Sequence, residues 1–426
     1  MAHINYHRNV RFYGRLPLSQ ALPAENWQAS FAAFCGRIEQ RREAGLQAIR
    51  RCIGRVGIIL LQNDPLLAEE IEGLPEALPA PGGDRQESGR VYSINPPGSP
   101  VHYLAPLYGM NHEEVLNAII PTSGDNDSRA AVVAARDGLN AYLRILELQF
   151  LRSRARNPRF SGHSPYRLDL LEQLVALSYQ ELDRQVLNQL PEAERRSIRE
   201  TLSADGRILL VRGWVNDFTS LMSSVLWTRQ SEARHGTIGI RDAMLHCGLV
   251  NISLPNPSPA LLRYLLCELN SLRTANIDFL LVAAETSLVS FPPLCQLFTD
   301  PHTTARYRTG LLSADASCVL SPTQADTALG SLLSQHHEVL VFRCDNANQA
   351  TPFAAALGSY QRIVREQSTG RSRQPFAFFS SHETGVAQHE VTEYNVTIND
   401  LIGREDGAVL CGALYPTPLL IGHVFP

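Results

Sequence analysis

Short runs of apolar residues recur along the second half of the chain and alternate with stretches of helical periodicity. Apolar runs occupy Gly248–Pro255, Ile277–Glu285 and His336–Asp345, and helical spacing follows the first two at Ser258–Ala275 and Thr286–Thr299. A strand that is apolar throughout is buried on both faces, as in a parallel sheet covered by helices. The pattern therefore predicts an α/β fold with a mostly parallel sheet and helices on both of its faces.

The same alternation is expected to continue to the C-terminus. The run at 308–321 predicts a strand, the segment 322–335 a helix, and the long segment 348–367 a further helix. Four strand-like segments close the chain, at residues 375–381, 394–400, 407–414 and 418–426. Between the first two of these, the stretch His382–Glu393 is interpreted as a polar loop.

The first half of the chain has a similar but less regular pattern. Residues 8–14 predict a short strand that ends in Gly14. Helical spacing of Trp27, Phe31 and Phe34 predicts a helix over Pro23–Gly45. Further strands are expected at 55–64 and 91–94, with a loop rich in proline, glycine and acidic residues at 74–89.

A helical region is expected in the middle of the chain. Helices are predicted at 113–120 and 129–150, a basic linker at 152–165, and more helix at 165–203, 216–230 and 240–247. The predicted organisation is thus a sheet domain in two parts, residues 1–150 and 236–426, with a small helical insertion at residues 151–235.

Composition excludes several classes of protein. The chain has 426 residues, 44% of them hydrophobic and 19% charged, with a net charge of -4. These values suit a globular protein and give no general attraction to nucleic acid or anionic lipid. No apolar run is long enough to span a membrane, and the N-terminus lacks the apolar segment of a secretory signal. The eight cysteines are scattered without a CxxC pair, which predicts reduced thiols of a cytoplasmic protein.

All 38 basic residues other than histidine are arginine, and the chain contains no lysine. A genome rich in G and C favours arginine codons and accounts for part of this bias. Avoidance of a lysine-targeting modification is the alternative explanation. In either case no lysine is present to bind a phosphate, form a Schiff base or act as a base.

The segment Val250–Gly358 carries several motifs of one family in the expected order. A strand ends in Ser-Leu-Pro at Pro255, and the apolar run Phe279–Val282 precedes Ala284 and Glu285. Gln324 follows the next predicted strand, and a helix then closes with Ala-Leu-Gly at Gly358. These motifs resemble the conjugative coupling proteins of type IV secretion, the TraD/TraG-like group of FtsK/HerA-class P-loop ATPases. The resemblance covers most of the chain and implies a RecA-like domain.

By this resemblance, Ala284 stands where the Walker B aspartate should be, and Glu285 keeps the place of the neighbouring glutamate. Gln324 matches the residue that senses the γ-phosphate, and Arg308, with Arg306 beside it, stands where an arginine finger would lie at a subunit boundary. Towards the N-terminus, Leu104–Gly109 and the pair at 135–136 match two family elements more weakly. The vestigial catalytic candidates are therefore Glu285, Gln324 and Arg308.

The phosphate-binding loop is where the chain departs from the family. A P-loop reads GxxxxGK[ST] between a strand and a helix. The segment expected at this place begins with Gly14 and Arg15, but Ser19 replaces the second glycine and Gln20 replaces the lysine. Ala21 stands in place of the Mg²⁺ ligand. The resemblance therefore implies a degenerate nucleotide site and a pseudo-ATPase, and no cofactor is expected.

Other candidate sites have ordinary structural explanations. The stretch His382–Glu393 contains HExxE instead of the zincin motif HExxH, so no metal site is predicted. Cys344 closes an apolar strand and is interpreted as a packing residue instead of a nucleophile. The arginines at 152–159 and at 371 and 373 leave contact with nucleic acid phosphates open, although such charges are usually solvated.

Three functions follow from these observations. The first is a non-catalytic coupling-protein-like subunit or adaptor of a secretion or conjugation machine. Its partners would be the other subunits, in a homo- or hetero-oligomer, and it would lie in the cytoplasm or at the inner membrane through a partner, without inserting itself. The second is a translocation motor that binds nucleotide unconventionally, with Arg15 in place of lysine. The third is a lysine-free secreted effector that acts on lysine-modifying machinery.

Overall fold

The structure is a computed structural model of the full chain. It describes residues 10–17, 32–74, 90–94, 102–121, 129–157, 164–204, 206–225, 237–299, 308–312, 329, 333, 338–372, 381–412 and 415–425. The chain divides into two compact units, one formed by residues 1–45 and 312–426 and the other by residues 46–311. We refer to them as unit 1 and unit 2 and describe each by itself.

Unit 2 contains four parallel strands that pair in the order β8-β3-β7-β4. Their bounds are Gly57–Gln62 for β3, Val91–Ile94 for β4, Leu249–Ser253 for β7 and Phe279–Ala284 for β8. β9 (Arg308–Leu312) lies next to β8. Every residue of β3, β7 and β8 is buried. These apolar strands confirm the predicted α/β class with a mostly parallel sheet.

Helices near the sheet of unit 2 connect its strands. They are α3 (Pro65–Glu72), α10 (Ile240–Leu245), α11 (Pro259–Thr274) and α12 (Pro292–Thr299). Among them, α10 packs against β3 and β7, and α11 packs against α12. Two very short strands, β5 (Tyr103–Leu104) and β6 (Thr237–Ile238), pair in parallel. The predicted strands and helices between residues 240 and 299 are confirmed, although α12 begins only at Pro292.

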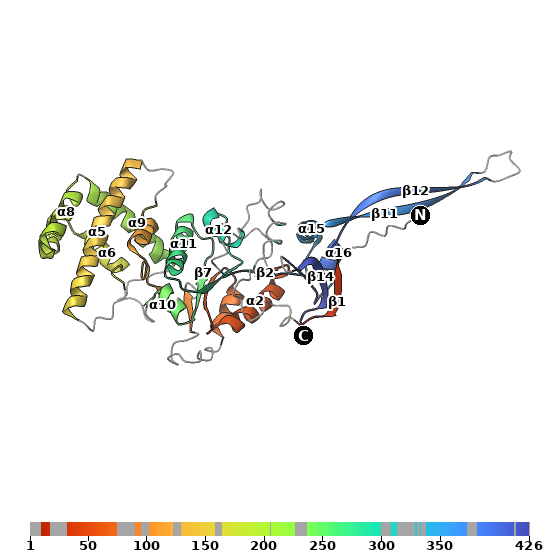
Figure 1. The fold of residues 1–426 in the computed structure, drawn as a ribbon, viewed down its shortest axis with the longest axis horizontal. Helices are drawn as coiled ribbons and strands as arrows, with labels where there is room; N and C mark the ends of the chain where they lie inside the picture. Colours follow the sequence, from red (N-terminus) through yellow and green to blue (C-terminus); the bar gives the residue numbers. More distant parts are fainter. Residues whose placement is uncertain are drawn as a thin grey trace. The chain divides into compact units, whose positions relative to one another are not determined.

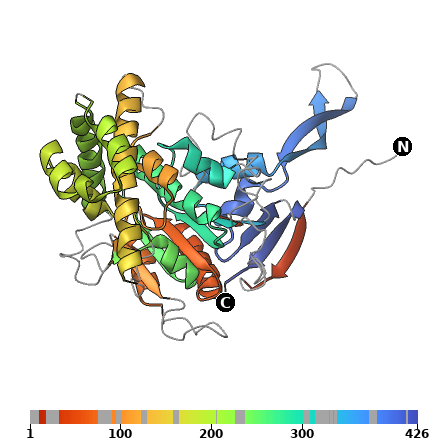
Figure 2. The same ribbon diagram turned by 60° about the vertical axis from the view of Figure 1, so that its left-hand side comes forward.

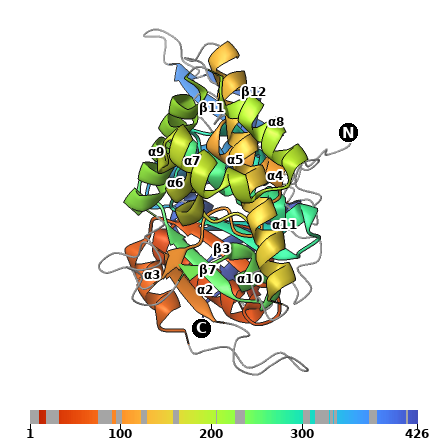
Figure 3. The same ribbon diagram turned by 90° about the vertical axis from the view of Figure 1, so that its left-hand side faces the viewer.

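A helical layer makes up the rest of unit 2 (Figures 1 and 3). It consists of α4 (His112–Ile119), α5 (Arg129–Arg156), α6 (Leu168–Ala176), α7 (Tyr179–Gln185), η1 (Leu187–Gln189), α8 (Glu192–Leu202) and α9 (Arg207–Val225). The long helix α5 packs against α4, α6, α8 and α9. The predicted linker at 152–165 is wrong at its start, because α5 continues to Arg156. That the segment 151–235 forms a separate domain stays a prediction.

Among the described residues of unit 1, five strands pair side by side in the order β1-β14-β13-β10-β2. β1 (Arg11–Arg15) is parallel to β14 (Tyr415–His423), and β10 (Glu338–Phe342) is parallel to β2 (Ala32–Cys35). β13 (Ala408–Gly412) pairs antiparallel with both of its neighbours. Helix α15 (Ala347–Ala356) packs against α16 (Ile398–Ile402), and α2 (Ile38–Cys52) continues from unit 1 into unit 2.

A two-stranded ribbon completes unit 1 (Figure 2). β11 (Ser359–Ser372) and β12 (Ser381–Tyr394) pair antiparallel over 14 residues each. Two predictions are wrong here. The helix expected over 348–367 ends at Ala356, because Gly358 has a left-handed φ of +86° that stops it. The expected loop His382–Glu393 lies within strand β12.

Two further expectations are wrong for local reasons. The segment expected as a strand at 394–400 contains the start of α16, where Thr397 and Asp400 form a capping box. The helix expected over Pro23–Gly45 contains strand β2, and α2 begins only at Ile38. Gly36 separates the two elements with a φ of +95°. The predicted helix at 322–335 and the predicted strand at 375–381 lie almost entirely outside the described residues.

Candidate functional site

The carboxyl ends of the unit 2 strands meet at one edge, which is where ligands bind in open α/β sheets. Gln62 at the end of β3 is in register with Ser253 of β7 and with Ala284 of β8. Glu285 follows Ala284 directly and Asp64 lies two residues beyond Gln62, so the predicted Walker B position and the end of β3 lie side by side. This edge is the first candidate site.

Hydrogen bonds fix the backbone at this edge. The Asp64 amide donates to Oε1 of Gln62 over 2.6 Å, and the Asp64 carboxylate accepts from the amides of Leu66 and Leu67 at the start of α3. Thr286 Oγ1 donates to the carbonyl of Leu254 over 3.1 Å. The side-chain oxygen of the buried Gln62 therefore accepts a hydrogen bond within the turn. Its Nε2 has no hydrogen-bond partner among the described residues.

Glu285 leaves β8 in a conformation that is unusual for a residue with a Cβ. Its φ is +53°, and the residue is half-buried. Such a left-handed conformation costs of order 1 kcal/mol and persists only where the surrounding structure enforces it. The position of Glu285 at the strand end is that expected for the family glutamate. Its role as a polarising base stays a prediction.

The structure describes only part of the predicted P-loop. Gly14 and Arg15 are part of strand β1, and Arg15 is paired with His423 of β14. Ser19, Gln20, Gln324 and Arg306 lie outside the described residues, and Arg308 is the first residue of β9. Nucleotide binding by this segment stays a prediction.

The sequence analysis missed a strand-to-helix junction in unit 1, where β2 runs through Gly36 and Arg37 into α2. A Cβ on Gly36 would lie 2.4 Å from the carbonyl oxygen of Phe342, so only glycine fits. The amide of Arg37 donates to the carbonyl of Arg343 over 2.7 Å. Arg41, which is buried, donates to the carbonyl of Gly36 over 2.8 Å. The glycine after the apolar run at 31–35 was the available sequence indication.

Charges at this junction are paired within unit 1. Nε of Arg37 lies 3.4 Å from carboxylate oxygens of both Glu39 and Asp345. Glu39 also places a negative charge in the first turn of α2, where a phosphate would otherwise be attracted. The backbone amide of Arg37 is therefore not free to bind a phosphate, and the guanidinium of Arg37 is already paired with carboxylates.

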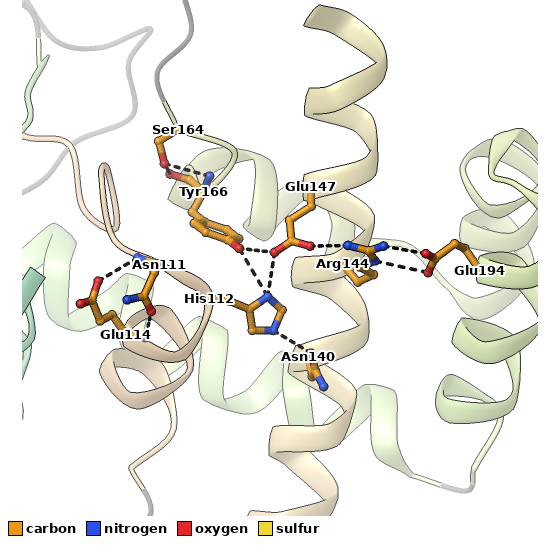
Figure 4. A network of polar contacts seen from close by, with 9 residues as sticks. All are labelled: Asn111, His112, Glu114, Asn140, Arg144, Glu147, Ser164, Tyr166 and Glu194. Atoms are coloured by element: carbon orange, nitrogen blue, oxygen red, sulfur yellow. Dashed lines mark hydrogen bonds and ion pairs between the residues drawn. The ribbon is translucent and has the colours of Figure 1, made fainter. Parts of the chain in front are cut away.

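A polar network in the helical layer is the second candidate site (Figure 4). Nδ1 of His112, the first residue of α4, lies 2.9 Å from Oε1 of Glu147 in α5, and its Nε2 lies 2.6 Å from Oδ1 of Asn140. The hydroxyl of Tyr166 donates to the same Glu147 oxygen. A carboxylate beside a histidine and a tyrosine is an arrangement that acid–base catalysis can use.

Arg144 extends this network to α8. It donates to Oε2 of Glu147 over 2.9 Å and to both carboxylate oxygens of Glu194, over 2.6 and 3.3 Å. The hydrogen bonds that Arg144 donates to Glu194 and Glu147 raise the pKa of Arg144 above its ordinary value. The forked geometry holds α5 and α8 together through one guanidinium.

The protonation of the network argues for a structural role. Burial alone would raise the pKa of Glu147, but hydrogen bonds from Tyr166, His112 and Arg144 together hold it below its ordinary value. Burial and the bond to Glu147 raise the pKa of Tyr166 well above its ordinary value. Both ring nitrogens of His112 already have partners. The network therefore connects the helices through charged and hydrogen-bonded groups. It does not present an acid and a base for catalysis.

The remaining candidates from the sequence have little catalytic potential. His382 and His389 lie on strand β12, not on the helix that a zincin site requires, and no group of three possible metal ligands occurs among the described residues. Burial raises the pKa of Cys344 to about 11, so its thiol stays protonated. Arg154 and Arg156 are exposed at the end of α5. In the part of the chain that the structure describes, no helix is long and apolar enough to span a membrane.

Comparison with known proteins completes the description. No family model matches the chain, and neither does any curated protein. Among solved structures, the bacterial conjugative coupling protein TrwBdeltaN70, in an unbound monoclinic form, is 11% identical with a TM-score of 0.47. The match covers 97% of this chain and 88% of that one. The complex of TrwB with the non-hydrolysable GTP analogue GDPNP has a TM-score of 0.45 at 11% identity.

These matches are to conjugative coupling proteins. They cover 97% of the chain, and they fall in the group that the sequence motifs resemble. At this identity and TM-score they assign no activity, ligand or partner to the chain.

Proposed function

We propose that this protein is a coupling-protein-like subunit or adaptor of a type IV secretion or conjugation machine that does not hydrolyse ATP in the ordinary way. The observation that carries the proposal is the strand-to-helix junction at Gly36, which has the strand–glycine–helix order of a P-loop, although the family resemblance places the P-loop at residues 14–21. A P-loop presents unbonded backbone amides, a lysine and a hydroxyl to the phosphates. The motifs of Val250–Gly358 supply the link to the family.

The junction supports the loss of phosphate binding in three ways. The amide of Arg37 is already bonded to a carbonyl, and the guanidinium of Arg37 is already paired with carboxylates. The first turn of α2 carries Glu39, which repels phosphate. The chain has no lysine anywhere. Because phosphoryl transfer depends on positioning and charge neutralisation, a site without these groups offers little catalysis.

The same proposal includes partners and location. The chain would work through other subunits of the machine, as one member of a homo- or hetero-oligomer. It would lie in the cytoplasm and reach the inner membrane through a partner. Contact with nucleic acid would be minor, given the net charge of -4.

Isothermal titration calorimetry with ATP and Mg²⁺, together with a phosphate-release assay, tests the proposal. We expect no binding at millimolar ATP and no release above the buffer rate. Glu285→Gln is the matched variant, because it removes the one retained catalytic carboxylate without changing size. Turnover by the wild type that this variant abolishes would reject the pseudo-ATPase and favour the motor with an unconventional site.

A further inference from the structure

The ribbon of β11 and β12 has two unpaired edges. The two strands form a sheet of their own, and among the described residues no other strand pairs with either of them. A two-stranded ribbon is at best marginally stable in water, and open edges are templates for pairing with another chain. With 14 residues in each strand, this ribbon extends for about 45 Å.

The strand sequences do little to block such pairing. Neither β11 nor β12 contains proline, and the pairing runs from Ser359↔Tyr394 to Ser372↔Ser381 without a bulge. Proline, bulges and charged side chains are the usual features that keep edge strands from associating. Proline and bulges are absent over the whole length, so the charged side chains determine which strand can pair with each edge.

The two strands carry opposite charges. β11 has three arginines and one glutamate, a net charge of +2, whereas β12 has three glutamates and no arginine. Inside the ribbon, no arginine lies directly opposite a glutamate. Arg362 faces Val391, Arg365 faces Gln388 and Arg371 faces His382. The acids Glu390 and Glu393 are only diagonal neighbours of Arg365 and Arg362, and Glu393 accepts a hydrogen bond from Tyr360 over 2.7 Å.

One register between two ribbons places these charges directly opposite each other. Within the ribbon Arg362 faces Val391, so a shift by two residues places Arg362 opposite Glu393. The same shift places Arg365 opposite Glu390 and Glu366 opposite His389. An even shift keeps every residue on its own face of the sheet. Pairing β12 with a second β12 would bring together only acidic charges, and pairing β11 with a second β11 would bring together six arginines and two glutamates.

We propose that β11 of one copy pairs antiparallel with β12 of a second copy in this shifted register. The ribbons then form a continuous antiparallel sheet between copies. Because each ribbon offers a β11 edge on one side and a β12 edge on the other, the contact is head-to-tail and repeats around a ring or along a filament. This proposal does not depend on whether the protein binds nucleotide.

Charge reversal on the full-length chain tests the register. Arg365→Glu and Glu390→Arg each place like charges opposite one another, so each variant self-associates more weakly than the wild type, by roughly three- to thirtyfold for each contact. An equimolar mixture of the two variants restores association, and so does the double variant R365E/E390R. Sedimentation velocity over a range of concentrations measures the wild type, the two single variants, their mixture and the double variant.

Arg371→Glu is the matched control. It makes the same charge change on the same strand and the same face as Arg365→Glu, but the shifted register places residue 371 opposite Thr384. It therefore leaves association unchanged. If this control weakens association as much as Arg365→Glu does, or if mixing the two reversed variants restores nothing, the proposed register is wrong.

Hydrogen exchange on the wild type tests the pairing without any substitution. In an antiparallel ribbon alternate amides point outward and have no partner inside the ribbon. These alternate amides of β11 and β12 are expected to become protected as protein concentration rises. A chain that stays monomeric, or that associates while these amides remain unprotected, would overturn the proposal.

Discussion

At the scale of single residues, two buried groups show how strongly the local surroundings determine behaviour. Gly36 is fixed by a left-handed φ and by the carbonyl of Phe342. Glu268 of α11 is buried, accepts a hydrogen bond from Tyr264, and has its pKa raised to about 8, mainly by burial. Neither the close approach to Gly36 nor the burial of Glu268 could be predicted from the sequence, because both depend on groups from other elements.

Gly36→Ala is expected to destabilise the protein by about 2 kcal/mol or more, since a Cβ meets a backbone carbonyl and the left-handed φ is unfavourable. Chemical denaturation measures the free energy of unfolding. Gly14→Ala is the control: a Cβ there meets nothing within 4 Å, so its effect should stay within about 0.5 kcal/mol. Equal effects of the two substitutions would contradict the geometry described for the junction.

Glu268 predicts a pH dependence of stability. The folded protein holds the Glu268 proton up to a pKa of about 8, whereas the ordinary value is 4.5. Between these values the folded state binds more protons than the unfolded state. The free energy of unfolding therefore falls as pH rises, by at most about 1.4 kcal/mol per pH unit from this group. The negative charge of Glu114 contributes in the same direction as burial.

Glu268→Gln isolates this contribution. The amide keeps an acceptor for Tyr264 but cannot ionise, so the decline between about pH 5 and pH 8 should be smaller than in the wild type. Denaturant titrations at several pH values across this range measure the slope for both proteins. Parallel pH profiles of wild type and variant would show that Glu268 is not the group responsible.

At the scale of elements, the sequence predicted those strands and helices that are determined by a local pattern of apolar and polar residues. The buried strands β3, β7 and β8 follow from their continuous apolar runs, and the helices from α4 to α10 follow from their periodicity, except that α9 begins at Arg207 and not at the predicted residue 216. The failures have physical reasons. β2 was missed because Phe31 and Phe34 also fit helical spacing. β11 and β12 were missed because their residues are mostly polar, and they are strands only through pairing with each other.

The candidate sites were predicted less well than the elements. Glu285 was placed at a strand end, and the structure has it there. The network around His112 joins residues up to about fifty positions apart in the sequence, such as Arg144 and Glu194. Since such contacts depend on how helices pack, no local pattern indicates them.

The ion pair between α5 and α8 leads to a prediction about α8. Arg144→Gln removes the guanidinium that bridges Glu147 and Glu194. Because the Arg144 side chain is 43% exposed, solvent screening limits the loss to about 1 kcal/mol or less. Hydrogen exchange should show faster local opening of α8. Arg196→Gln, whose nearest carboxylate oxygen is 3.9 Å away and whose side chain is 73% exposed, should change exchange far less.

At the scale of the whole molecule, the proposed function joins a mostly parallel α/β sheet to a nucleotide site that the family resemblance predicts to be degenerate. By that resemblance Ala284 stands where the Walker B aspartate should be, the junction at Gly36 is closed by its own hydrogen bonds, and lysine is absent. We infer that such a chain contributes shape and contacts to an assembly. The buried strands supply that shape regardless of whether nucleotide is bound.

This inference predicts that nucleotide does not stabilise the fold. A ligand that binds only the native state adds RT ln(1 + [L]/Kd) to the free energy of unfolding, about 2.7 kcal/mol at one hundred times Kd. A working site with micromolar affinity would therefore raise Tm by several degrees in millimolar ATP and Mg²⁺. We expect no change in Tm for ATP, ADP or GTP, measured by differential scanning calorimetry.

Mg²⁺ alone and inorganic phosphate serve as controls for nonspecific ion effects. A rise in Tm that is specific to nucleotide, and that is lost in Glu285→Gln, would mean that the edge formed by β3 and β8 binds nucleotide after all.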